Sequence, residues 1–143
     1  MPLRPAVKAD LIRTAPLFAR CSKEEIRRVA AIAEERNLAT GTELIREGDD
    51  AREFFVVIEG AAEVRRHGRK VSTIGIGGFV GELAILSDTP RSATVTAATP
   101  LDVLVISRRD FLSLVGEMPS ISTKVARALA DRVAADARRD DVL

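Results

Sequence analysis

Cysteine, histidine and the large aromatic residues are scarce in this sequence, which has one cysteine, one histidine, and no tryptophan or tyrosine. The single thiol, Cys21, excludes a disulfide bond within the chain. No charged leader followed by an apolar core opens the sequence, so a secreted protein has no support. We therefore expect a cytoplasmic protein in a reducing compartment.

The single histidine argues against a metalloenzyme built on a β-barrel. Such a site needs several histidine and carboxylate ligands on facing strands. His67 instead precedes Gly68 in a pattern typical of a hairpin tip. We expect no metal, no cofactor, no catalytic residue and no enzymatic activity.

Long apolar runs and an excess of one charge are also missing. No stretch approaches the roughly 20 apolar residues needed to cross a bilayer. The 22 basic and 21 acidic side chains leave a net charge of +1, which indicates no general affinity for nucleic acid or anionic membranes. A transcription factor would further need a DNA-reading helix-turn-helix after the β region, and the chain ends before one. We expect a soluble chain, either a whole protein or the cytosolic part of a longer one.

Hydrophobic residues at 46% and charged residues at 30% fit one globular domain over residues 1–143. Residues 1–36 are predicted to form N-terminal helices, chiefly from Lys8 to Glu35, with a capping box at Ser22 and Glu25. Apolar residues recur there at helical spacing: Ile26, Val29, Ala30 and Ala33. Charged residues of the other side are expected to face solvent: Arg27, Arg28, Glu34, Glu35 and Arg36.

Residues 37–107 change to short β-type runs at the spacing typical of an antiparallel sandwich or barrel. Glu59-Gly60 and His67-Gly68 are predicted hairpin corners. Residues 108–143 return to helix, with Ser107 as N-cap and Asp110 in the first turn. A break at 118–120 precedes a longer helix whose lower part is expected to pack on the β region. Its apolar stripe is Ile121, Val125, Leu129 and Val133.

The segment 78–94, GFVGELAILSDTPRSAT, places a glutamate and an arginine around an apolar run. After Gly81 the run is long enough for one or two helical turns, whose first N–H groups and positive dipole end would attract an anion. Arg91, held after Pro90, can close a charge-assisted contact with a phosphate. The segment therefore predicts a phosphate site.

These residues resemble the phosphate-binding cassette of the cyclic nucleotide-binding domain family. The resemblance rests on Gly81-Glu82-Leu83-Ala84 and Pro90-Arg91-Ser92-Ala93-Thr94, together with REGDD at 46–50 and FFVVIEGAAEV at 54–64. It implies an α+β fold, an antiparallel, jelly-roll-like β-roll of about eight strands. N-terminal helices and C-terminal hinge and lid helices would flank this roll.

The resemblance also implies roles for single residues. Glu82 would accept a hydrogen bond from the ribose 2′-hydroxyl, and Arg91 would neutralise the cyclic phosphate. The backbone amides of Leu83 and Ala84 would complete the phosphate cradle, and Ser92 would contact the phosphate or the base. The ligand implied is cAMP, with cGMP as the alternative.

Two features bear on how the base is held. The family often has an aromatic residue where Val80 stands, and the last helix carries no aromatic residue to stack on the base. The base would have to be covered by a second subunit or by one of four residues of this helix: Arg127, Leu129, Arg132 or Val133. The strand from Arg69 lacks an arginine at Ser72 or Thr73 that would read guanine O6, which favours cAMP.

The predicted function is a regulatory module whose C-terminal helices move when a cyclic nucleotide binds. The signal would pass to an attached effector or to a homodimer partner through the C-terminal helix. Two alternatives remain open: a nucleotide-free structural or interaction domain of the same fold, and the detached sensor of a larger channel, transcription factor or enzyme.

Overall fold

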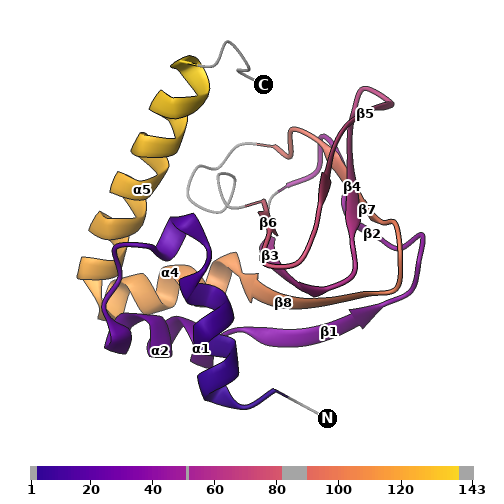
Figure 1. The fold of residues 1–143 in the computed structure, drawn as a ribbon. Helices are drawn as coiled ribbons and strands as arrows, with labels where there is room; N and C mark the ends of the chain where they lie inside the picture. Colours follow the sequence, from indigo (N-terminus) through magenta and orange to yellow (C-terminus); the bar gives the residue numbers. More distant parts are fainter. Residues whose placement is uncertain (1–2, 51, 82–89, 139–143) are drawn as a thin grey trace.

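The computed structural model describes residues 3–50, 52–81 and 90–138, except for some side chains of the last helix, among them Leu129, Arg132 and Val133. Helices stand at both ends of the chain and strands lie between them (Figure 1). The helices are α1 (Pro5–Arg13), the 3-10 turn η1 (Pro16–Phe18), α2 (Lys23–Ala31), α4 (Arg108–Glu117) and α5 (Pro119–Arg138).

The strands of the described residues form two antiparallel sheets of four strands each. The first contains, in spatial order, β1 (Glu34–Leu38), β8 (Leu101–Ser107), β3 (Glu53–Glu59) and β6 (Phe79–Val80). The second contains β2 (Glu43–Ile45), β7 (Thr94–Ala97), β4 (Ala62–Arg66) and β5 (Arg69–Ile74). This arrangement confirms the predicted antiparallel β-roll flanked by helices.

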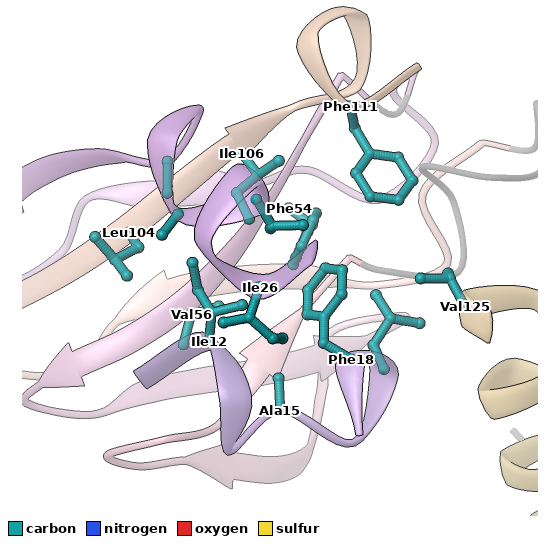
Figure 2. Packing of buried hydrophobic residues seen from close by; sticks show 14 of the residues in the cluster. Ile12, Ala15, Phe18, Ile26, Phe54, Val56, Leu104, Ile106, Phe111 and Val125 are labelled. Atoms are coloured by element: carbon teal, nitrogen blue, oxygen red, sulfur yellow. The ribbon is translucent and has the colours of Figure 1, made fainter. Parts of the chain in front are cut away.

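Successive side chains of a strand point to opposite faces of the sheet. The central strands of the first sheet have unbroken apolar runs because both of these faces are buried. In β3, Phe54 and Val56 pack against the helices, whereas Phe55 and Val57 face the second sheet. Figure 2 shows the rings of Phe18, Phe54 and Phe111 together in the helical core. Their centroids lie 5.9 to 6.5 Å apart, within the range of favourable aromatic pairs.

The N-terminal boundary differs from the sequence prediction. The predicted helix to Glu35 is wrong beyond Ala31, because α2 ends there and Glu34–Leu38 forms β1. β1 pairs with β8 along its whole length, from Glu34 opposite Val105 to Leu38 opposite Leu101. Glutamate and arginine favour helices, but pairing with a strand far along the chain outweighs that local preference.

Several local predictions are confirmed. The Ser22 hydroxyl and the Glu25 carboxylate form the capping box of α2, and Ser107 Oγ accepts a hydrogen bond of 3.1 Å from the Asp110 N–H. His67 and Gly68 both have positive φ between β4 and β5. The helix break falls at Met118, after which α5 starts. Ile121 and Val125 of α5 are fully buried in the cluster that contains Phe54 of β3.

Glu25 has a second role, since it also holds α5. Its carboxylate accepts hydrogen bonds from Ser120 Oγ and Lys124 Nζ, each at 2.5 Å. Burial disfavours the charged carboxylate, but hydrogen bonds from Lys124, Ser120 and Ser22 outweigh burial and lower the pKa of Glu25 from 4.5 to about 2. The carboxylate therefore stabilises the fold only while it is ionised.

This shift predicts a loss of stability in acid. A carboxyl with a lower pKa in the folded chain contributes fully above its unfolded pKa, and the contribution disappears as the pH falls through the folded pKa. For Glu25 that window runs from about pH 4.5 down to about 2. As the pH falls from 6 to 3, the titration of Glu25 should lower the unfolding free energy of the wild type by about 2 kcal/mol. Glu25→Gln keeps a residue suited to the capping box and should lose less over this range, as measured by urea unfolding. Equal losses in both proteins would contradict the assignment.

Candidate functional site

Two strand ends position the part of the predicted cassette that the structure describes. Gly81 directly follows β6 of the first sheet, and Arg91 and Ser92 come shortly before β7 of the second. Glu82, Leu83 and Ala84 lie outside the described residues, so their roles stay predictions. The structure thus brings Gly81 and Arg91 together and leaves the rest of the cassette to experiment.

Arg91 is a buried charge, with only 7% of its surface exposed. Its guanidinium donates Nη1–H to the Gly81 carbonyl at 3.2 Å and Nη2–H to the Glu53 carbonyl. These contacts with described residues use only part of the N–H donors that a guanidinium carries. The same side chain can therefore still donate to an anion.

The backbone of Arg91 is held as firmly as its side chain. Its N–H donates to the Asp49 carbonyl at 2.8 Å, and its carbonyl accepts from the Gly48 N–H at 2.9 Å. The turn between β2 and β3 therefore runs beside Arg91 and pairs with it. This turn carries the REGDD sequence at 46–50. The motif therefore has a structural role, since its backbone holds the backbone of Arg91.

Burial sets the electrostatics of Arg91. It lowers the pKa of the guanidinium, and the nearby Glu53 carboxylate opposes this change. An arginine nevertheless stays charged at neutral pH, because the ordinary pKa of its guanidinium lies far above neutral. A buried positive charge is stabilised by an anion that enters beside it, which is the property a phosphate site needs.

Gly81 is suited to this place by conformation and by space. Its φ is +86°, a region that side chains rarely adopt. A Cβ atom there would lie 2.4 Å from Arg91 Nη1 and 3.2 Å from Ile45 Cδ1. Only glycine lets the guanidinium reach the Gly81 carbonyl.

A cavity of about 340 Å³ borders Arg91 on the side of the β2–β3 turn. Its charged lining residues are three arginines and three acids: Arg46, Arg52, Arg91, Asp49, Asp50 and Glu53. Because these charges balance, the cavity has no net preference for an anion. The predicted phosphate role of Arg91 therefore depends on the cassette segment and not on this cavity.

The remaining predicted residues are less buried. Ser92 is exposed, and its carbonyl accepts a hydrogen bond from Arg66 Nε at 3.0 Å. Arg127 of α5 is exposed. Leu129, Arg132 and Val133, the other candidates to cover the base, have side chains outside those that are described. Their roles, like that of Ser92, stay predictions.

Sequence reasoning missed two neighbours of Arg91, Ile45 and Glu53. Glu53 contributes its main-chain carbonyl to Arg91, while its carboxylate pairs with Arg36 at 3.3 Å. A carbonyl contact has no signature in the sequence, because every residue carries that group. Ile45, the last residue of β2, lines the same cavity as Arg91.

The described part of the chain also bears on a metal site and a membrane span. No group of three or more histidine, cysteine, aspartate or glutamate side chains that could hold a metal ion is found among these residues. His67 pairs with Glu47, with Nδ1 and Oε2 3.0 Å apart. Among the described helices, none is long and apolar enough to cross a membrane.

Comparison with known proteins gives one consistent result. The model of the cyclic nucleotide-binding domain family matches residues 35–118. The chain is 34% identical to a cAMP-dependent protein kinase regulatory subunit of Mycosarcoma maydis over 133 residues, which cover 87% of this chain and 25% of that protein. It is 40% identical to the Pycsar effector protein PaPycTIR of Pseudomonas aeruginosa over 108 residues, which cover 75% of this chain and 35% of that protein.

A solved structure extends the match to the three-dimensional level. The N-terminal domain of a transcriptional regulator from Streptomyces coelicolor A3(2) is 32% identical, with a TM-score of 0.78, over 88% of this chain and 94% of that one. The chain thus spans about a quarter to a third of the curated relatives but nearly all of this solved domain. From the β-roll, the buried arginine at its cassette and these matches, the chain belongs to the cyclic nucleotide-binding domain family.

Proposed function

We propose that this chain is a regulatory, non-catalytic module that binds a cyclic nucleotide, with cAMP as the preferred ligand. One observation carries the proposal, the buried guanidinium of Arg91 held against the Gly81 carbonyl. A cyclic phosphodiester carries one negative charge and loses water on entering a cleft, and a buried arginine offsets that cost. The similarity to a cAMP-dependent protein kinase regulatory subunit supports the choice of ligand.

Within this proposal the cassette divides the ligand between its residues. Arg91 and the amides of Leu83 and Ala84 bind the phosphate, Glu82 accepts a hydrogen bond from the ribose 2′-hydroxyl, and Ser92 contacts phosphate or base. A carboxylate beside a phosphate is unfavourable unless it is paired. A 2′-hydroxyl gives Glu82 that partner, so a 2′-deoxy analogue should bind less well.

The preference for cAMP rests on the strand β5. There Ser72 lies opposite Val64 and Thr73 opposite Glu63 on β4. Neither position has an arginine that could donate to guanine O6. A pocket without that donor gains nothing from guanine over adenine, whereas burial of O6 without a donor would cost binding free energy.

The proposed output is a movement of α4 and α5. Ligand binding can shift these helices only by as much as it favours one arrangement over another. The chain spans about a quarter to a third of its curated relatives, which supports a sensor that controls an attached effector or a dimer partner.

Calorimetric titration of the chain with cAMP, cGMP, 2′-deoxy-cAMP and 5′-AMP tests the proposal. We expect cAMP to bind most tightly, with cGMP and the deoxy analogue about tenfold weaker, because each loses the equivalent of about one hydrogen bond. The dianionic 5′-AMP should bind more weakly still. Equal affinity for cAMP and cGMP would overturn the preference alone. No heat from any cyclic nucleotide would overturn the function.

One observation favours the alternative of a nucleotide-free domain. Two carbonyl groups already accept hydrogen bonds from Arg91, which fits a residue that only joins the segment before β7 to the end of β6 and the start of β3. The same titration separates the two functions, because a purely structural arginine predicts no binding to any of the four nucleotides.

A further inference from the structure

One face of α5 makes polar contacts with the N-terminal helical region. Ser120 and Lys124 each donate to the Glu25 carboxylate of α2 at 2.5 Å. Further along the helix, Asp131 accepts a hydrogen bond of 3.0 Å from Arg20, which precedes α2. All three residues of α5 contact the stretch from Arg20 to Glu25, so these polar contacts tie α5 to that stretch.

The contacts at Glu25 are partly buried, whereas the one at Arg20 is largely exposed. Glu25 has 3% of its surface exposed, and 35% of the Lys124 side chain is exposed. Separating a buried carboxylate from its partners is costly unless water or another donor replaces them. An exposed ion pair such as Arg20 with Asp131 contributes much less. Glu25 is therefore the main polar contact that α5 must break before it can move away from α2.

Among the side chains that the structure describes, the buried apolar contacts of α5 come from its first turns. Ile121 and Val125 anchor its first turns in the helical core, and the upper part of the helix stands apart from both sheets (Figure 1). Ala128 is half-buried, and the other described residues beyond the anchors are exposed: Ala126, Arg127, Ala130, Asp131 and Ala134. The direction of α5 thus depends on its polar contacts as well as on its core contacts.

We propose that Glu25, Ser120 and Lys124 form an ionic lock that holds α5 on the N-terminal helices and opposes its movement when a cyclic nucleotide binds. This inference rests on the proposed function, because it assumes that the ligand favours a different position of α5. The free energy needed to open the ionic lock is then subtracted from that of ligand binding. The ionic lock would set the concentration of cyclic nucleotide at which the module responds.

Variants that weaken the ionic lock should therefore bind cAMP more tightly. Glu25→Gln keeps the capping box but removes the ion pair with Lys124, and Ser120→Ala removes a contact of α5 without touching the cap of α2. We expect each to raise the affinity about three- to tenfold in calorimetric titration. The matched control is Glu117→Gln, which breaks an exposed pair between α4 and Arg28 of α2 without involving α5. Its affinity should stay within about twofold of the wild type.

Cys21 gives a second measurement that does not depend on affinity. Burial, then the nearby Glu25 carboxylate, raise the pKa of this half-buried thiol to about 11, so it should react slowly with N-ethylmaleimide at neutral pH. If α5 leaves α2, alkylation of Cys21 should become at least about threefold faster, both on adding cAMP to the wild type and in Ser120→Ala without ligand.

The outcomes separate this inference from the proposed function. If no cyclic nucleotide binds the wild type, the proposed function fails and the regulatory role of the ionic lock fails with it. If cAMP binds but Glu25→Gln and Ser120→Ala, shown to be folded by circular dichroism, bind it no more tightly than the wild type, only the ionic lock is overturned. Tighter binding in both variants together with faster alkylation of Cys21 supports it.

Discussion

Arg91→Ala is expected to weaken cAMP binding about 100-fold, equivalent to about 3 kcal/mol. The guanidinium is buried against Gly81 and is the charged group of the described cassette residues. Without it, the phosphate would lose water and gain no opposite charge in return. Calorimetric titration of wild type and variant at the same salt concentration measures the loss.

Arg91→Lys separates charge from geometry. Lysine keeps the positive charge but lacks the planar fork that can donate to two carbonyls and to a phosphate at once. We expect about a tenfold loss of affinity, between that of the wild type and that of the alanine variant. If lysine and alanine weaken binding equally, hydrogen-bond geometry dominates over charge at this site.

The control for both variants is Arg46→Ala. Arg46 lines the same cavity as Arg91, but 69% of its side chain is exposed and it pairs with Glu43. Its removal should change the affinity by less than about twofold. An affinity of Arg91→Ala equal to the wild type, or an equal loss in Arg46→Ala, would contradict the role assigned to Arg91.

Stability must be measured beside affinity, since Arg91 also holds the chain. Alanine leaves the carbonyls of Gly81 and Glu53 without this donor, which should cost about 1–3 kcal/mol of unfolding free energy. Titrations at temperatures well below the unfolding midpoint of each variant keep the protein folded, so the loss of stability does not affect the measured affinity. Any remaining difference in affinity then belongs to the ligand site.

Features that depend on neighbouring residues could be predicted from the sequence. The capping box of Ser22 and Glu25 and the N-cap Ser107 lie within a few residues of their partners. The hairpin at His67 and Gly68 has the same local character. Each prediction used a pattern with one main physical solution, and each is confirmed.

Features that depend on distant partners could not be predicted. Most residues of β1 are good helix formers, and their strand conformation comes from pairing with β8, more than sixty positions later. Glu25 was predicted as a capping residue, but its contacts with Ser120 and Lys124 span 95 and 99 positions. Neither the pairing of β1 with β8 nor the contacts of Glu25 with α5 can be recognised from residues that are near in the sequence.

The candidate site shows the same division. The residue types around Gly81 and Arg91 indicated a phosphate site because they carry that chemistry, and the family resemblance implied the cassette. The partners that hold the guanidinium are main-chain carbonyls, and the turn that pairs with the backbone of Arg91 comes from 48–49. Such contacts follow from the arrangement of the strands and become visible only in the structure.

Gly81→Ala is expected to weaken cAMP binding about 30-fold and to lower the unfolding free energy by about 2 kcal/mol. Two effects add at this position. The φ of +86° is unfavourable for alanine, and its Cβ would lie 2.4 Å from Arg91 Nη1. Either the guanidinium or the backbone must shift, and both changes remove Arg91 from its place beside the cassette.

Gly41→Ala isolates the backbone effect. Gly41 has a nearly equal φ of +90°, but a Cβ there would have no atom within 4 Å. This variant should lose about 1 kcal/mol of stability without any change in affinity, because it strains the backbone and displaces no side chain. Thermal unfolding and calorimetric titration of both variants measure the two quantities.

If Gly81→Ala loses stability but binds cAMP as the wild type does, the contact between Gly81 and Arg91 serves the fold alone. If its affinity falls while that of Gly41→Ala does not, the position of the Arg91 guanidinium, and not backbone strain, controls binding.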